Sequence, residues 1–337
     1  MPVYKCKTLI STPLDLLHGA GRVPRLSSVY SRVKLLASRA EVPLKRIERE
    51  IARDPAICAR LPRLARALYP ALGQGAASVT GVLAILGGER IKHLILITAV
   101  AAAYRKIKSS QFDMRRFWRL AARRALLARL IAMEAAHVDP TRAFVGGLLA
   151  DVGHLVLHLG IPVPALDAQT RAVQSGLPVH EVEQALLGFD YAAVGAALMR
   201  RWHHSAAIET AIEYQMRPLS APEARGDACT LHIATRLALA IEDGIAPEHL
   251  IAGIDAPIWN TVGRSDQLLA QIAANAAQDF DELAQALSPE IVLPAASRPA
   301  PETLLADAAV PIAQARAKKL LRMPAAANAN ALQRKVS

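Results

Sequence analysis

The chain has 337 residues, of which 53% are hydrophobic but only 4% aromatic, and its formal net charge is +11. Alanine and leucine supply most of the apolar side chains, so the composition favours helices and is sufficient for a sizeable core. The longest apolar run, residues 94–103, is about half the roughly 20 residues that a membrane-spanning helix needs, so we expect no membrane span. The few scattered cysteines, Cys6, Cys58 and Cys229, argue against a disulfide framework and favour the cytoplasm.

Apolar residues at helical spacing predict helices along most of the chain. Pro43 and Asp113 are typical of helix starts, and Pro62 is expected to kink or restart a helix. In chain order, we expect helices over residues 26–37, 43–53, from 55 onward, 78–86, 89–104, 113–136, 139–159, 165–175, 178–187, 191–202, 206–215, 228–242 and 266–287. The connecting loops are expected at residues 69–78, 160–164 and 217–226.

Composition divides the chain into three parts. Residues 1–22 show little helical pattern and are expected to be a loosely ordered lead-in. Residues 23–287 carry the predicted helices. From residue 288 onward, frequent prolines and an alanine-rich stretch predict a mobile tail with one short helix near residues 312–322.

Seven segments, in order along the chain, together resemble the HDOD domain family, the bacterial relatives of the HD metal-dependent phosphohydrolases. They are residues 23–26 (VPRL), 51–57 (IARDPAI), 82–90 (VLAILGGER), 117–119 (FWR), 143–157 (AFVGGLLADVGHLVL), 187–202 (LGFDYAAVGAALMRRW) and 231–237 (LHIATRL). The resemblance implies an all-α fold. It implies an N-terminal helical bundle, about residues 23–110, packed on a second, HD-like bundle, about residues 111–287.

The same resemblance implies a metal centre whose ligands are missing here. HD phosphohydrolases bind divalent metal through a histidine, an adjacent His-Asp pair and a later aspartate. The corresponding positions here are Leu120, Ala150-Asp151 and Thr235. Leucine and alanine cannot bind metal, and one carboxylate cannot hold a catalytic ion. We therefore expect HD hydrolysis to be lost.

Two further family positions have also changed. A histidine usual after Gly-Phe-Asp is Tyr191, and a Tyr-His-His stretch is Tyr214-Gln215-Met216. These changes remove further histidines from the expected site and place in doubt any ligand inherited from the family.

A different metal site is an open alternative. Asp151, His154 and His158 are spaced i, i+3 and i+7, which places them on one helix face. With His180 or His232 as a fourth ligand they could bind a transition metal and support a divergent phosphohydrolase. The competing interpretation is that the three are ordinary structural residues, and their order matches no established zinc motif.

A row of arginines offers another alternative. Residues 1–130 hold 25 Lys and Arg against 7 Asp and Glu, and Arg116, Arg119 and Arg123 share one helix face. Such a stripe could bind the phosphates of a nucleotide or of nucleic acid. A solvated helix face would look the same, and no DNA-reading motif accompanies the stripe, so nucleic acid is the weaker alternative.

The hypothesis that accounts for most of these observations is a non-enzymatic bacterial regulatory protein. It would transmit a signal by binding a regulatory protein or ligand, with a cyclic-dinucleotide or two-component pathway as the setting that the family suggests. We expect no cofactor and a cytoplasmic location. The alternatives remain the divergent phosphohydrolase and the anion or nucleic-acid binder.

Overall fold

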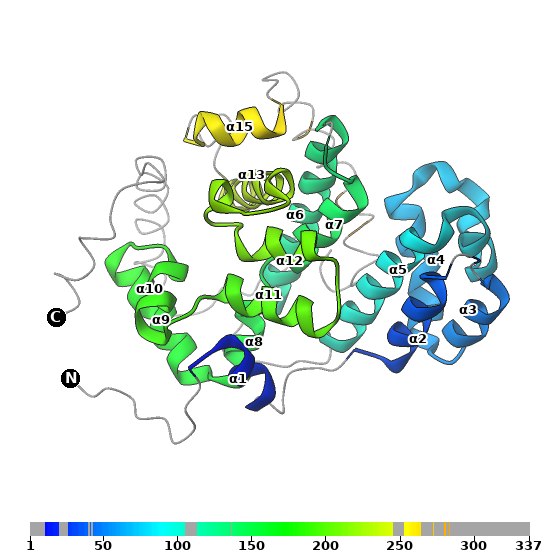
Figure 1. The fold of residues 1–337 in the computed structure, drawn as a ribbon, viewed down its shortest axis with the longest axis horizontal. Coiled ribbons are helices and arrows are strands. Elements are labelled where there is room, and N and C mark those ends of the chain that lie inside the picture. Colours follow the sequence, from blue (N-terminus) through cyan, green and yellow to red (C-terminus); the bar gives the residue numbers. More distant parts are fainter. Residues whose placement is uncertain are drawn as a thin grey trace, which may run out of the picture.

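The computed structural model describes residues 11–19, 26–39, 41, 43–104, 113–135, 137–244, 253–263 and the single positions 272, 280 and 283. Every regular element within these residues is a helix, and no strand occurs among them, which confirms the predicted all-α fold. The helices form two groups, with α2 to α5 on one side and α6 to α15 on the other (Figure 1).

The first group is an N-terminal bundle. Its elements are α2 (Ser28–Ala37), α3 (Leu44–Ile51), α4 (Pro55–Leu68), the 3-10 helix η1 (Pro70–Ala77) and α5 (Val79–Tyr104). Ser27 and Asp54 cap α2 and α4, because each side chain accepts a hydrogen bond from an amide of the first turn. The expected interruption of α5 is present at Gly87, whose φ of 71° is left-handed. The segment expected to be a loop after α4 contains η1 instead.

The second group is a larger bundle. Its elements are α6 (Met114–Glu134), α7 (Pro140–Leu149), α8 (Val152–Gly160), α9 (Pro162–Ser175), α10 (Val179–Leu187), α11 (Tyr191–Arg201), α12 (Ala206–Glu213), η2 (Pro218–Ser220), α13 (Arg225–Glu242) and α15 (Ala256–Val262). Asp113, Asp139 and Asp190 cap α6, α7 and α11 through hydrogen bonds from the amide three residues later. Aspartate at each of these starts explains why the three helices begin where they do.

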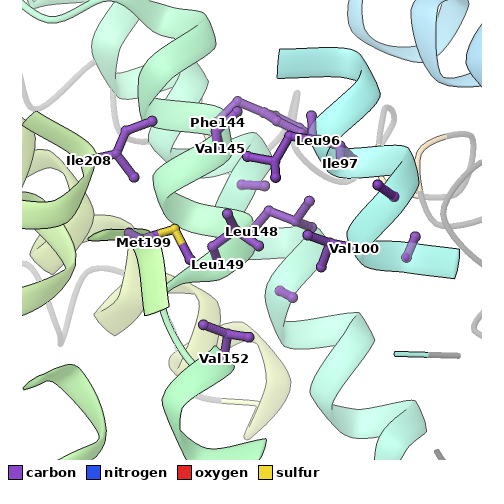
Figure 2. Close-up of a cluster of buried hydrophobic side chains, with 14 of the residues drawn as sticks. Leu96, Ile97, Val100, Phe144, Val145, Leu148, Leu149, Val152, Met199 and Ile208 are labelled. Atoms are coloured by element: carbon purple, nitrogen blue, oxygen red, sulfur yellow. The ribbon is translucent and has the colours of Figure 1, made fainter. Parts of the chain in front are cut away.

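An apolar core joins the two bundles. Figure 2 shows side chains of α5 facing side chains of α7, with α8, α11 and α12 contributing from the other side. The labelled residues, all buried, are Leu96, Ile97, Val100, Phe144, Val145, Leu148, Leu149, Val152, Met199 and Ile208. At the edge of this contact the Lys34 ammonium of α2 donates a hydrogen bond to the carbonyl of Trp202, at 3.2 Å. The predicted packing of an N-terminal bundle on an HD-like bundle is thus confirmed.

Two further expectations about local structure are wrong. The lead-in contains a helix, α1 (Pro13–Gly19), because Thr12 and Asp15 cap each other's amides and Leu16 and Leu17 are buried. Arg201 donates to the Leu17 carbonyl at 2.7 Å, so α1 lies against α8 and α11 and away from α2 (Figure 1). The single helix expected over residues 139–159 is two helices, α7 and α8.

The run Pro140–Gly160 is long and apolar enough to cross a membrane, but 78% of its most apolar window is buried inside the protein. Together with the break between α7 and α8, this burial identifies the run as a core element. The helix expected at residues 266–287, apart from three single positions, and the tail from residue 288 lie outside the described residues.

Candidate functional site

The break between α7 and α8 places Ala150 and Asp151 between α6 and α11. Two glycines allow this close approach. A Cβ on Gly147 would lie 2.7 Å from the Ala125 Cα of α6, and a Cβ on Gly153 would overlap the Tyr191 carbonyl oxygen at the start of α11. Because any side chain at these two positions would separate the helices, the glycines determine where Asp151 sits.

The Asp151 carboxylate forms an ion pair with an arginine of the same chain. The Arg124 guanidinium of α6 donates a hydrogen bond from Nη2 to Asp151 Oδ2. The Arg124 side chain is fully buried, whereas the Asp151 side chain is 20% exposed. Within the part of the chain that the structure describes, Nε and Nη1 of Arg124 have no hydrogen-bond partner. The carboxylate expected to survive from a metal centre is therefore neutralised by an arginine.

A second buried network lies beside this pair. The His154 ring of α8 stacks on the Tyr191 ring, with centroids 3.7 Å apart, and its Nδ1 lies 3.3 Å from Glu183 Oε1. The Glu183 carboxylate also accepts a hydrogen bond from the Tyr191 amide at 2.8 Å. Burial alone would lower the pKa of His154, but Glu183 and Asp151 raise it above its ordinary value.

The segment after α12 closes the site. Gln215 donates from Nε2 to the Ala150 carbonyl at 2.9 Å, and the Tyr191 hydroxyl donates to the Met216 sulfur at 3.2 Å. The His232 ring of α13 forms a hydrogen bond through Nδ1 to the Gln215 carbonyl, at 2.7 Å. The structure therefore brings together the segments around Ala150, Tyr191 and Met216, as the family resemblance implied.

Comparisons with known proteins identify the family of the chain. The model of the HDOD domain family matches residues 23–218, more than half of the chain. The chain belongs to the HDOD domain family. Among solved structures, it is similar to a candidate phosphohydrolase from Shewanella amazonensis SB2B, with 25% identity, a TM-score of 0.65 and coverage of 81% of this chain and 98% of that one.

Two further proteins are similar to this HDOD chain. A candidate signal transduction protein from Marinobacter aquaeolei VT8 is similar in structure, with 22% identity, a TM-score of 0.62 and coverage of 82% of this chain and 66% of that one. An uncharacterised protein from Treponema pallidum (strain Nichols) is 20% identical over 205 residues, or 60% of this chain. This HDOD chain spans only 39% of the length of that relative.

The residues of this HDOD site do not fit the divalent metal of the HD phosphohydrolases. Leu120 is buried in an apolar cluster with α13, Ala150 is fully buried, and the Arg124 cation occupies the side of Asp151 that faces α6. Thr235 of α13 is buried and offers only a hydroxyl. Among the described residues, no group of three or more His, Cys, Asp and Glu side chains could hold a metal ion.

The alternative set of Asp151, His154 and His158 is also corrected by the structure. The three residues lie along α8 and its first cap, but each has its own partner. Asp151 binds Arg124, His154 faces Glu183, and His158 bonds through Nδ1 to the backbone carbonyl of His154 at 2.8 Å. The three side chains thus have separate partners, and they form no metal-ligand group among the residues that the structure describes.

The arginine stripe of α6 is paired with acidic residues at the end of α13. Arg116 lies 3.2 Å from Asp243, Arg123 lies 2.7 Å from Glu242, and Arg119 also binds Glu242. Arg119 and Arg123 are partly buried against Glu242, whereas the pair of Arg116 and Asp243 is exposed to solvent. Their contacts fasten α6 to α13, so the expectation of a phosphate-binding stripe loses its basis.

Two residues of the site were not identified as site residues from the sequence. Arg124 was not considered as a site residue, although it follows Leu120 by four residues and so lies on the same apolar face of α6. That placement was the available signal. Glu183 gave no signal, because its contact with His154 and Tyr191 depends on how α10 packs.

A cavity of about 340 Å³ borders the site between α10 and the segment after α12. Its lining residues include His180, Glu181, Asp190, Glu213 and Met216. Met216 connects the cavity to the site, because its sulfur accepts the hydrogen bond from Tyr191. His180, expected as a possible fourth metal ligand, lines this cavity.

Histidines whose pKa is lowered predict a loss of stability in acid. Burial lowers the pKa of His232 from 6.5 to about 4, and burial with neighbouring cations lowers that of His204 to about 3. Between pH 6.5 and 4 the unfolded chain takes up protons at these sites while the folded chain does not, so the free energy of unfolding falls as the pH falls. We expect His232→Gln to reduce this slope in thermal unfolding measured from pH 7 to pH 4.5.

His137, which is exposed, provides the control. His137→Gln should leave the pH dependence of unfolding as it is in the wild type. An unchanged slope in His232→Gln would contradict the assignment of His232 as a buried neutral histidine.

Proposed function

We propose that this HDOD protein is a non-catalytic regulator that acts in bacterial signalling by binding a protein partner. The observation that carries the proposal is the identity of the side chains at the remnant site. Leu120 and Ala150 supply no metal ligand, and Asp151 is held by Arg124. Without a metal ion to polarise a phosphate ester and activate water, HD hydrolysis has no chemical basis here.

Exposed side chains favour a protein partner over nucleic acid. The helix α9 buries Ala165, Ala168 and Ala172 and exposes Val163, Leu166 and Val173 on its opposite face. Apolar side chains gathered on an exposed face are typical of surfaces that contact proteins. The arginines expected to attract nucleic acid are instead paired within the chain. A cyclic-dinucleotide or two-component pathway is the setting that the family suggests for such a partner.

A hydrolysis assay tests the proposal against its main alternative, a divergent phosphohydrolase. Purified protein would be incubated with Mn²⁺ and a cyclic dinucleotide or bis(p-nitrophenyl) phosphate. We expect no turnover above the rate of Mn²⁺ alone, and the same result for Asp151→Asn and His154→Ala. Turnover by the wild type that disappears in either variant would establish the enzyme and refute the proposal.

A further inference from the structure

Arg124 lies on the same face of α6 as Leu120. It follows Leu120 by one helical turn, and Leu120 stands where the HD phosphohydrolases carry their first metal-binding histidine. Residues four apart lie on one helix face, so the face that would present this histidine presents a guanidinium. The backbone of α6 at Arg124 contacts α7, because a Cβ on Gly147 would lie 2.8 Å from the Arg124 carbonyl oxygen.

The surroundings of the Arg124 guanidinium have the electrostatics of an ion site. The side chain is fully buried, and an uncompensated charge in such a place is costly. Its carboxylate partner is Asp151, with the buried Glu183 and His154 in the adjoining network. Tyr191 lies close enough to both members of the pair for each to influence its pKa. The cation thus joins α6 to the break between α7 and α8, beside the start of α11.

We propose that the Arg124 guanidinium takes over the electrostatic role of the divalent metal. It neutralises Asp151, holds α6 to the α7–α8 break, and excludes a divalent cation from the same carboxylate. Arginine is the most basic of the side chains and carries a delocalised positive charge. A second cation beside it would meet strong repulsion in a buried site. The proposal shares with the proposed function the loss of metal ligands, and it adds the reason why the site remains folded.

A double-mutant cycle tests the first part. The variants are Arg124→Met, Asp151→Asn and the two combined, with the midpoint of thermal unfolding as the readout. We expect each single change to lower the midpoint, because it leaves one buried charge without its partner. The combined variant should lose less than the sum of the two. Additive losses would overturn the proposal. If Arg124→Met does not fold, rescue by Asp151→Asn supports it, and failure of the combined variant counts against it.

A metal-binding experiment tests the second part and separates charge from packing. Leu120→His and Ala150→His would be introduced together in three chains: one that keeps Arg124, one with Arg124→Lys and one with Arg124→Met. Mn²⁺ binding to each chain would be followed by electron paramagnetic resonance. We expect Mn²⁺ to bind at least about tenfold more tightly with Arg124→Met than with Arg124 or Arg124→Lys, since only the first removes the cation. Equal affinity in all three chains would overturn the exclusion of metal by Arg124.

These outcomes are distinct from failure of the proposed function. Turnover by the wild-type protein would refute the non-catalytic role while leaving the coupling of Arg124 and Asp151 intact. Additive losses in the cycle would refute the role of Arg124 without making the protein an enzyme.

Discussion

Gly153→Ala is expected to destabilise the protein by about 3–5 kcal/mol or to prevent folding. A Cβ at this position would overlap the Tyr191 carbonyl oxygen and lie 2.9 Å from the Gly195 amide nitrogen. Both atoms belong to the backbone of α11, so no side-chain movement can relieve the clash. The helices α8 and α11 would have to separate, which would also disturb the stacking of His154 on Tyr191. Thermal or urea unfolding of the purified variant measures the effect.

Gly146→Ala is the matched control. Gly146 is also buried in this part of the chain, but nothing lies within 4 Å of a Cβ built on it. Because alanine is the better helix former, the control should be neutral or stabilise the protein by up to about 1 kcal/mol. A loss in Gly153→Ala no larger than the change in Gly146→Ala would show that α8 and α11 are not in direct backbone contact.

Asp227→Ala is expected to lower the free energy of unfolding by about 3 kcal/mol, because it removes one partner of a largely buried ion pair. Arg142 of α7 approaches Asp227 of α13 through two nitrogens, with Nε at 2.6 Å from Oδ1 and Nη2 at 3.0 Å from Oδ2. The Asp227 side chain is only 8% exposed and also lies in the first turn of α13, where a negative charge is favourable. Equilibrium urea unfolding measures the loss.

Asp167→Ala provides the comparison on the surface. Asp167 and Arg171 form an i, i+4 pair on α9 at 3.0 Å, and both side chains are substantially exposed. Removing such a pair should cost less than about 0.5 kcal/mol. If Asp227→Ala and Asp167→Ala lose the same amount, the pair between α7 and α13 does not stabilise the bundle as its burial implies.

Helix starts were the part of the fold that local sequence determined best. Asp113 and the proline at position 43 lie at the beginnings of α6 and α3 because capping and a fixed φ act within one turn. The break between α7 and α8 could not be predicted in this way, because the apolar helical pattern continues through Ala150. It arises from packing, where Gly147 and Gly153 bring the chain against two different helices.

The sequence predicted only which metal ligands the candidate site lacks. Leu120 and Ala150 could be recognised as unable to bind metal from their identity alone. The presence of a buried cation beside Asp151 could be recognised only from the fold, since Arg124 looked like its neighbour Arg123 in the sequence. In the structure Arg123 pairs with Glu242, whereas Arg124 turns inward to Asp151. Adjacent residues on a helix point about 100° apart, and the neighbouring helices decide which of them is buried.

The metal content of the purified protein tests the central claim most directly. The chain would be loaded with excess Mn²⁺ or Zn²⁺, passed through a desalting column and analysed by elemental mass spectrometry. With Leu120 and Ala150 at the ligand positions and Arg124 on Asp151, we expect metal far below stoichiometry and no change in Asp151→Asn. Stoichiometric metal in the wild type that is lost in Asp151→Asn would contradict the claim that this site has lost its ability to bind metal.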